Sequence, residues 1–364
     1  MDIYAAAGVD YDVLDAGKRA AVSAAAQTTG YAASRGAVGN DASRGETAFC
    51  FQLGNQHLAT VLECLGTKST IARQVQDELG INRFDAIDYD TVAAAVNDLV
   101  CVGAMPLVVN AYFATGAPDW YRQPGRFEAL VAGFKQACEH SGAMWGGGES
   151  PGLSGIVEET EIDLAASATG AVAHGVAPLL GDELHDGDDI VLVSSTGLHA
   201  NGSSLARKIA SHSPDGWATK LPSGRGFGEA VLDPSAIYVS LVENLLADRS
   251  DVTYLSHITG HGFRKLMRAN ADFTYRITEV PPVPEVLRFM VDKADMTTSD
   301  AYGTFNMGAG FAVMCRPSAT DEVLSVAKRC GFEAWRSGTV EAGERKVVIE
   351  PLGVTYLDQD LQLR

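Results

Sequence analysis

Apolar residues recur along the chain with two spacings, one typical of strands and one typical of helices. In the first half, this pattern predicts strands at 57–63, 106–113 and 161–173 and helices at 90–103 and 126–140. The second half repeats the mixture, with strands expected at 188–195, 307–315 and 346–350 and helices expected at 203–210, 234–248 and 321–331. A mixture of this kind in both halves predicts the α+β class, with helices against one face of each sheet.

The chain becomes polar and glycine-rich near residues 173–182, which divides it into two parts. A chain of 364 residues is long enough for two hydrophobic cores. We therefore expect two domains, at 1–173 and 174–350, followed by a tail at 351–364.

The helix expected at 90–103 contains two polar residues in an otherwise apolar surface. Val96 and Val100 recur at helical spacing, and Asn97 and Asp98 lie between them. A solvated helix face would explain this pair, and so would a carboxylate that is held for binding or catalysis.

The net charge is −18, from 46 acidic and 28 basic residues, which disfavours nucleic-acid binding because the field repels phosphate backbones. Phosphorylated substrates would therefore need Mg²⁺ or a few placed Lys and Arg side chains. No apolar run reaches the roughly 18 residues of a membrane span. The six cysteines are scattered without a CxxC pair, and the first residues do not resemble a secretory signal, so we expect a cytoplasmic protein.

Four glycine-rich stretches carry polar residues and could bring backbone N–H groups close to phosphate oxygens. They lie at 63–70, 146–155, 196–204 and 258–263, and none matches the Walker A pattern. Acidic candidates for a Mg²⁺–phosphate site are Glu63, Asp88, Asp98 and Glu149. No pattern of a covalent nucleophile or of a zinc site is present in the sequence.

Taken in chain order, these motifs resemble the aminoimidazole ribonucleotide synthetase (phosphoribosylformylglycinamidine cyclo-ligase) family of the PurM-like ATP-binding superfamily. The similarity extends over about residues 4–350. The stretches that carry it are YAAAGVD (4–10), GTK (66–68), AAAVNDLVCVGAMPLVVNAYFATG (93–116), GGE (147–149), LHANG (198–202), HITG (257–260) and TFNMG (304–308).

The resemblance implies a two-domain PurM-like fold, with an N-terminal α/β domain that pairs its sheet in a homodimer and a C-terminal α+β sandwich. It also implies an enzyme of purine biosynthesis that acts on small nucleotide substrates. Mg-ATP would phosphorylate the amide oxygen of formylglycinamidine ribonucleotide, and the amidine nitrogen would then close the imidazole ring and expel phosphate.

The resemblance also implies catalytic, ATP-binding and metal-binding roles for individual residues. The catalytic residues would be Asp98, His199, Asn201 and His257. The ATP-binding residues would be Gly66, Thr67, Lys68, Asn97, Gly147 and Gly148. The Mg²⁺ ligands would be Glu63, Asp98 and Glu149.

Several positions depart from the family pattern. Glu63-Cys64 replaces the Asp-Gly that usually precedes GTK, His261 replaces a glycine, and Ala236 occupies the place of an arginine. A replacement grip on the substrate phosphate would come from His261, Arg264, Lys265 and Arg268, unless this basic turn only caps a helix and faces solvent. The alternatives are therefore a superfamily enzyme with another amide or phosphate acceptor, such as a thiamine-phosphate kinase, and a non-catalytic nucleotide sensor.

Overall fold

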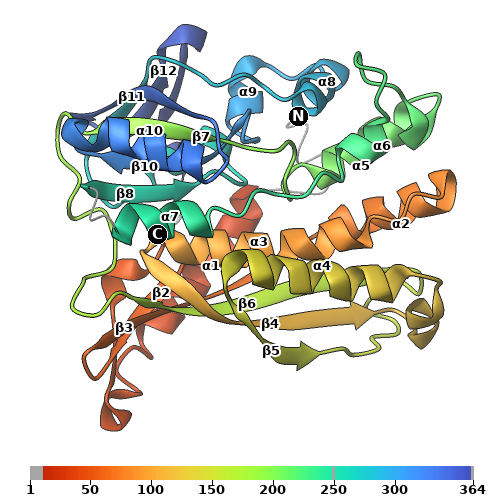
Figure 1. The fold of residues 1–364 in the computed structure, drawn as a ribbon, viewed down its shortest axis with the longest axis horizontal. Helices are drawn as coiled ribbons and strands as arrows, with labels where there is room; N and C mark the ends of the chain where they lie inside the picture. Colours follow the sequence, from red (N-terminus) through yellow and green to blue (C-terminus); the bar gives the residue numbers. More distant parts are fainter. Residues whose placement is uncertain (1–10, 248–250, 362–364) are drawn as a thin grey trace.

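The computed structural model describes residues 11–247 and 251–361, which form two domains that are each built on one sheet (Figure 1). The N-terminal sheet has the strand order β1-β2-β3-β6-β4-β5, and the C-terminal sheet has the order β13-β12-β9-β11-β7-β10-β8. The expected α+β class is thereby confirmed. The YAAAGVD stretch at 4–10 lies outside the described residues.

The N-terminal domain contains the elements expected in the first half of the chain, with small shifts at their ends. Its strands are β1 (Ala37–Gly39), β2 (Phe49–Leu53), β3 (Gln56–Cys64), β4 (Ala104–Thr115), β5 (Met144–Glu149) and β6 (Ile162–Val172). Its helices are α1 (Tyr11–Ala26), α2 (Lys68–Leu79), α3 (Phe84–Cys101) and α4 (Arg126–Ser141). Helix α3 begins before the expected residue 90.

The C-terminal domain adds strands that the apolar pattern did not indicate, notably β8, β9 and β11. Its strands are β7 (Asp189–Ser194), β8 (Val252–His257), β9 (Phe273–Ile277), β10 (Ala309–Cys315), β11 (Ala334–Ala342), β12 (Lys346–Ile349) and β13 (Val354–Leu357). Its helices are α5 (Ser203–His212), α6 (Phe227–Ala230), α7 (Val239–Ala247), α8 (Glu285–Lys293), α9 (Thr298–Tyr302) and α10 (Thr320–Arg329).

One expected helix in this domain starts later than predicted. The helix expected at 234–248 begins only at Val239, because the backbone amides of Ser235 and Tyr238 are bound by side chains of α3 instead of entering a helix. The residues expected as a tail from 351 include β13, which pairs antiparallel with β12 after a turn that ends at Gly353 with φ +63°. Glycine adopts this left-handed conformation without strain.

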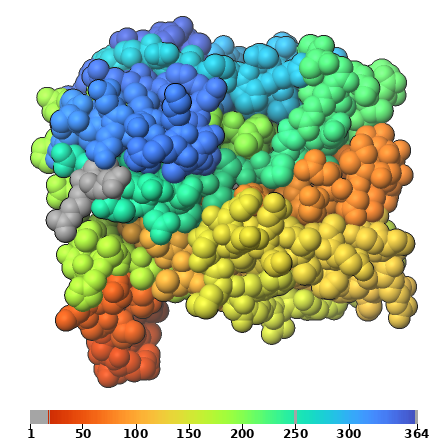
Figure 2. Space-filling model, viewed as in Figure 1, coloured from red at the N-terminus to blue at the C-terminus, as the bar shows by residue number. Residues whose placement is uncertain are grey.

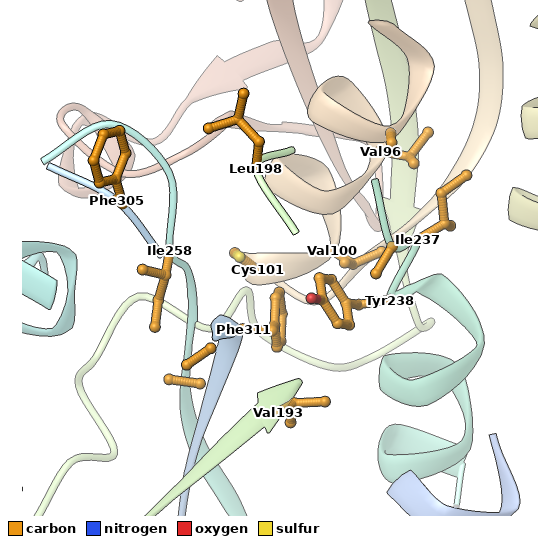
Figure 3. Close-up of a cluster of buried hydrophobic side chains, with 14 of the residues drawn as sticks. Val96, Val100, Cys101, Val193, Leu198, Ile237, Tyr238, Ile258, Phe305 and Phe311 are labelled. Carbon is orange, nitrogen blue, oxygen red and sulfur yellow. The ribbon is translucent and has the colours of Figure 1, made fainter. Parts of the chain in front are cut away.

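Helix α3 lies in the centre of the molecule, between the N-terminal sheet and the C-terminal domain (Figure 1). Nearly all of its side chains are buried, as expected for a helix that is apolar around most of its circumference. Figure 3 shows Val96 and Val100 of α3 in the same apolar cluster as Tyr238 and Phe311 of the C-terminal domain. The two domains therefore share part of one hydrophobic core.

The N-terminal sheet has one face covered by helices and one face without such a cover. Cα pairing places Ala59 of β3 beside Cys50 and Gly170, and Ala59 and Cys50 are fully buried beneath α3. The alternate residues of the same strands point away from the helices. Among them, Leu62 is 71% exposed, and the edge residue Met144 is 64% exposed. The N-terminal segment that leads into this sheet projects from the body in Figure 2.

No helix within residues 11–247 and 251–361 combines the length and the apolarity needed to cross a bilayer.

We expect Asp88→Asn to stabilise the fold. Neither carboxylate oxygen of Asp88 has a hydrogen-bond partner among the described residues, and burial raises the pKa of Asp88 well above its usual value. A raised folded-state pKa means that wild-type stability falls as the pH rises above the unfolded value near 3.9. At pH 7 the variant should gain at least about 1 kcal/mol in free energy of unfolding, measured by urea denaturation.

The gain from Asp88→Asn should shrink at pH 5, and Asp182→Asn at an exposed position should change little. Equal stability of wild type and Asp88→Asn at pH 7 would contradict the interpretation.

Candidate active site in the cleft between the domains

A cleft with room for about 470 Å³ lies between α3 and β3 of the N-terminal domain and three turns of the C-terminal domain. Its walls are lined by Glu63, Cys64, Leu65, Asp90, Ala94, Asn97, Asp98, His199, Ala200, Asn201, Ser235, His257, Thr259, Gly260, His261, Lys265 and Arg268. The structure therefore brings together the predicted residues Glu63, Asn97, Asp98, His199, Asn201, His257, His261, Lys265 and Arg268.

One stripe of α3 forms the N-terminal wall of the cleft. Asp90, Ala94, Asn97 and Asp98 are spaced at i, i+4, i+7 and i+8, so they lie on one side of the helix. Asp90 and Asn97 are almost completely buried, and Asp98 is only 8% exposed. The two polar residues that interrupt the apolar pattern of this helix thus face the other domain.

Asp98 and Glu63 form the acidic part of the cleft. Oδ1 of Asp98 is 2.6 Å from Nδ1 of His257. Burial by itself would raise the pKa of Asp98, but the hydrogen bond from His257 and the charges of His257, Arg268 and Lys265 hold it below its usual value. Burial and the charge of Asp98 raise the pKa of the neighbouring Glu63 to about 8. The two carboxyl groups therefore lie close enough to disfavour simultaneous ionisation unless a cation lies between them.

The basic part of the cleft comes from a 3₁₀ turn, Gly262–Met267, and the residues at its two ends. Lys265 and Arg268 are three positions apart, which places them on the same side of a 3₁₀ helix, and both line the cleft. Nε of Arg268 also donates to Gly45 O at 2.9 Å. His261 lines the cleft from the start of the turn, with φ +74° where a glycine would be free of strain.

Arg264 is directed elsewhere, which corrects its expected place in this basic group. Its guanidinium donates to the backbone oxygens of His261, Gly303 and Asp360. Because Arg264 lies one residue before Lys265, the 3₁₀ geometry turns it away from the cleft.

His199 is a wall residue with a fixed protonation state. Its Nε2 accepts the N–H of Thr196 at 3.2 Å and the N–H of Ala236 at 3.4 Å. Burial lowers the pKa of His199 to about 3, and the charges of His257 and Lys68 add to this effect. His199 therefore stays neutral at ordinary pH, and its Nε2 is unsuited to accept a proton from a substrate.

Lys68 does not line the cleft, which differs from its expected place at the ATP phosphates. Its side chain is fully buried, and its ammonium binds the carboxylate of Asp90. The ammonium also donates to His199 O at 2.7 Å and to Asp233 O at 3.4 Å. A lysine at the first position of a helix can reach inward in this way when a buried acid lies beneath it.

Asn97 bonds across the domain boundary. Its side-chain amide donates to Ala236 O at 2.8 Å and accepts from the N–H of Tyr238 at 2.8 Å. The amide thus pairs with the backbone of the C-terminal domain much as a neighbouring peptide group would.

Glu149 does not join Glu63 and Asp98, so the expected three-acid metal set is not assembled within one chain. Cα pairing runs from Cys64 through Ala165 and Tyr112 to Glu149 across four adjacent strands, a span of about 14 Å. Glu63 precedes Cys64 and points to the opposite face. Gly147 and Gly148 lie on the same exposed edge strand, β5. No group of three or more His, Cys, Asp or Glu within the described ranges has a geometry that could hold a metal ion.

Gly66 and Thr67 lie at the N-terminus of α2 and are not among the residues that line the cleft. Thr67 Oγ1 is 3.1 Å from Ser204 Oγ in the first turn of α5, so the N-termini of two helices from different domains meet here. Leu65 and Asn201, next to these N-termini, line the cleft. The positive ends of both helix dipoles therefore face the same region.

Asp90 and Ser235, which were not expected from the sequence, both line the cleft. Oδ1 of Asp90 accepts the N–H of Ser235 at 2.6 Å. The seven-residue spacing from Asp90 to Asn97 could have revealed the acid, because it places both on one helical face. No local signal indicates Ser235, since its role depends on the segment that docks against α3.

Comparisons with known proteins give consistent matches over both domains. The family described as AIR synthase related protein matches with its N-terminal domain at 45–172 and with its C-terminal domain at 185–350. The chain is 30% identical to the phosphoribosylformylglycinamidine cyclo-ligase of Pyrococcus furiosus over 358 residues, which are 98% of this chain and 100% of the relative. It is 32% identical to the enzyme of the same name from Methanothermobacter thermautotrophicus over 287 residues, which are 78% of this chain and 80% of the relative.

A crystal structure of the hydrogenase maturation protein HypE in complex with ATP is similar to this fold. Its TM-score is 0.59 at 19% sequence identity, over 84% of this chain and 87% of that chain. At this identity the likeness concerns the fold alone.

We expect His199→Gln to flatten the acid side of the stability profile. The folded-state pKa of His199, about 3, lies below the unfolded value near 6.5, so the unfolded chain binds the additional proton between these values. The contribution of His199 is therefore complete above pH 6.5 and is lost as the pH falls. Between pH 7 and pH 5 wild type should lose roughly 2 kcal/mol more than the variant.

Urea unfolding of both proteins at the two pH values measures this difference. Glutamine retains a side-chain oxygen that can accept from Thr196, so the variant is a conservative control for the hydrogen bond. Parallel losses in the two proteins would show that His199 does not titrate as described.

Proposed function

Because this chain belongs to the AIR synthase related protein family, we propose that it is a phosphoribosylformylglycinamidine cyclo-ligase, an ATP-dependent ligase of purine biosynthesis. The observation that carries the proposal is the cleft itself. It brings the acids Glu63 and Asp98 close to the cations Lys265 and Arg268, and the family motifs LHANG and HITG supply part of its lining. An enzyme of this kind would act in the cytoplasm, where ATP is abundant.

The reaction requires positioning and charge neutralisation more than a covalent nucleophile. The γ-phosphoryl group of ATP passes to the amide oxygen of formylglycinamidine ribonucleotide. The amidine nitrogen then attacks the activated carbon, phosphate leaves, and the imidazole ring closes. Cys50 fits this account, because burial raises the pKa of its thiol to about 12 and the side chain is inaccessible to a substrate.

The cleft has the donor chemistry that Mg²⁺ requires. Glu63 and Asp98 place two carboxyl groups side by side, and Mg²⁺ in nucleotide sites usually takes one or two carboxylates together with water and phosphate oxygens. These two residues would hold the ion. When bound, it would neutralise charge on the phosphates of ATP.

The triphosphate of ATP fits the region where α2 and α5 begin. Gly66 and Thr67 offer backbone N–H groups at the start of one helix, and Asn201 lies beside the start of the other. Helix N-termini favour anions, and the proposed metal ligands lie next to them in the cleft. The neutral His199 contributes shape to the wall on this side.

We assign the phosphate of the ribonucleotide to His261, Lys265 and Arg268. Two cations and an imidazole can replace the arginine that the family carries at the position of Ala236, since several basic arrangements hold a phosphate. They also offset the strong negative charge of the whole molecule at the place where an anionic substrate enters.

His257 is the group best placed to move a proton during ring closure. The hydrogen bond between its Nδ1 and Asp98 fixes the orientation of the ring. Nε2 is then the ring nitrogen that remains for proton transfer. The carboxylate of Asp98 would thus both orient His257 for proton transfer and help to hold the metal ion.

The open face of the N-terminal sheet suits a second copy of the chain. Phe51, Leu58 and Leu62 are on this face, and Leu62 is 71% exposed. Pairing of two such faces in a symmetric dimer would bury these residues. It would also cover the edge strand β5 of the sheet, which could otherwise associate with other chains. Gly147, Gly148 and Glu149 border this face, so in a homodimer they would meet the partner chain.

A coupled assay of ADP release tests the proposed reaction. Formylglycinamidine ribonucleotide should raise ADP release at least about tenfold above the basal rate and should yield an aminoimidazole product. Binding of Mg-ATP is measured in parallel by calorimetry. Protein that binds ATP without this stimulation would have a different acceptor, and protein that binds ATP without any turnover would be a nucleotide sensor.

Asp98→Asn should lower kcat by at least about 100-fold at saturating Mg²⁺, while the melting temperature stays within a few degrees of wild type. Asparagine keeps an oxygen toward His257 but removes the charge that neutralises the transition state. Asp85→Asn, in the first turn of the same helix, is the matched control and should retain activity. Near-wild-type turnover of Asp98→Asn would contradict a catalytic role and would indicate that Asp98 is only a structural residue.

Light scattering at micromolar concentration should give twice the monomer mass of 38.4 kDa. Leu62→Lys should shift the mass toward 38.4 kDa, because it places a charge at the centre of the proposed contact. The substitution costs little in the monomer, where Leu62 is mostly exposed. A monomeric wild-type protein would count against the homodimer.

A further inference from the structure

The ammonium of Lys68 has no donor left for a ligand. A protonated lysine has three N–H groups, and Lys68 has three acceptors: the carboxylate of Asp90, His199 O and Asp233 O. The side chains of Lys68 and Asp90 are both fully buried. One acceptor belongs to the N-terminal domain and two belong to the C-terminal domain, so the ammonium bonds across the boundary.

Asp90 completes the same connection from the other side. While Oδ2 of Asp90 binds Lys68, Oδ1 accepts the N–H of Ser235 at 2.6 Å. A buried ion pair of this kind is stable only when its remaining bonding capacity is used. Here that capacity is used by backbone groups of the C-terminal domain.

The segment 233–238 is thereby held against α3 in a non-helical form. Asn97 adds two bonds, to Ala236 O and from Tyr238 N. Thr196 Oγ1 donates a hydrogen bond to Pro234 O of the same segment at 2.6 Å, and the N–H of Ala236 donates to His199 Nε2. The turn that carries His199 and the segment 233–238 therefore form one unit, which α3 and Lys68 hold.

His199 itself depends on this unit. It adopts φ +59°, a left-handed conformation that costs energy for a residue other than glycine. The bond from Lys68 to the carbonyl of His199 stabilises the turn in that conformation. Loss of the bond would free the wall of the cleft next to Asn201.

We propose that Lys68 and Asp90 are positioning residues, which together hold the turn that carries His199, in the C-terminal domain, against helix α3. On this assignment Lys68 does not bind the phosphates of ATP. The inference rests on the proposed function only in taking ATP as the nucleotide. It assigns the lysine of the GTK turn to the alignment of the two domains, and it leaves contact with the phosphates to backbone N–H groups and to the metal.

A double-mutant cycle of Lys68→Met, Asp90→Asn and the combined variant tests this assignment. Each single substitution leaves one charge buried without its partner, so each should lower the melting temperature by more than about 5 °C. The combined variant removes both charges and should recover at least half of that loss. Additive losses in the cycle would overturn the proposal, because they would show that the two residues do not act together.

The affinity for Mg-ATP, measured by calorimetry, separates positioning from phosphate binding. If Lys68 positions the turn, the dissociation constant of the combined variant should lie within about threefold of that of Asp90→Asn, while kcat falls in both. If Lys68 binds phosphate, the combined variant should bind Mg-ATP at least tenfold more weakly than Asp90→Asn does. That result would overturn the proposal.

Amide hydrogen exchange provides a readout that does not depend on ATP. Exchange in peptides that span 196–202 and 233–238 should accelerate in Lys68→Met, because the bonds from Lys68 to His199 O and Asp233 O are lost and Asp90 of α3 loses its partner. Unchanged exchange there would overturn the proposal. If wild type fails to bind ATP, the proposed function fails, and the thermal cycle and the exchange data still decide the role of Lys68.

The pair of Arg126 and Asp77 provides the matched control. Arg126 is also buried and binds Asp77 at 2.6 Å, but both residues belong to the N-terminal domain. A cycle of Arg126→Met and Asp77→Asn should change the melting temperature and leave exchange at 233–238 unchanged. Faster exchange at 233–238 in this control would overturn the proposal, because any loss of stability would then open the segment.

Discussion

The position of helix α3 between two domains is the constraint on which the rest of the structure depends. A helix that is buried around its whole circumference must give every polar side chain a partner, because unpaired buried groups are costly. On the side toward the C-terminal domain, Asp90, Asn97 and Asp98 find those partners in Lys68 and in groups of the other domain. Asp88 has none among the described residues, and its raised pKa reflects that lack. The same stripe therefore joins the domains and forms a wall of the cleft.

The cleft resolves a conflict between the charge of the molecule and the charge of its substrates. A net charge of −18 repels phosphorylated ligands, yet Lys265, Arg268 and His261 gather in one place. Glu63 and Asp98 lie close to them, and adjacent carboxyl groups are donors of the kind that Mg²⁺ takes. Such an arrangement of acids and bases favours phosphoryl transfer, in which the catalyst mainly holds and neutralises its reactants. His199, which is neutral and bonded to backbone amides, supports the wall without exchanging protons.

Some positions that depart from the family pattern line the cleft, and another, Ala236, bonds across the boundary between the domains through its backbone. Asn97 and Lys68 are family residues that bond across the boundary. His261 and Cys64, which replace glycines, both line the cleft. A buried polar contact requires specific partners, whereas one basic group that binds phosphate can be replaced by another. The acceptor is thus the part of the activity most open to change.

The sequence by itself determined the α+β class, the two domains, the family and most of the residues that meet in the cleft, because apolar periodicity and ordered motifs are local signals. It did not determine where several side chains point. Lys68 turns inward to Asp90, Arg264 binds backbone oxygens away from the cleft, and Glu149 lies on the opposite face of the sheet from Glu63. The apolar pattern of 234–238 predicts a helix, yet the segment is not helical, since the amides of Ser235 and Tyr238 bond to α3. Only the tertiary structure decided these points, because each depends on a partner more than 20 residues away along the chain, and local spacing carries no information about it.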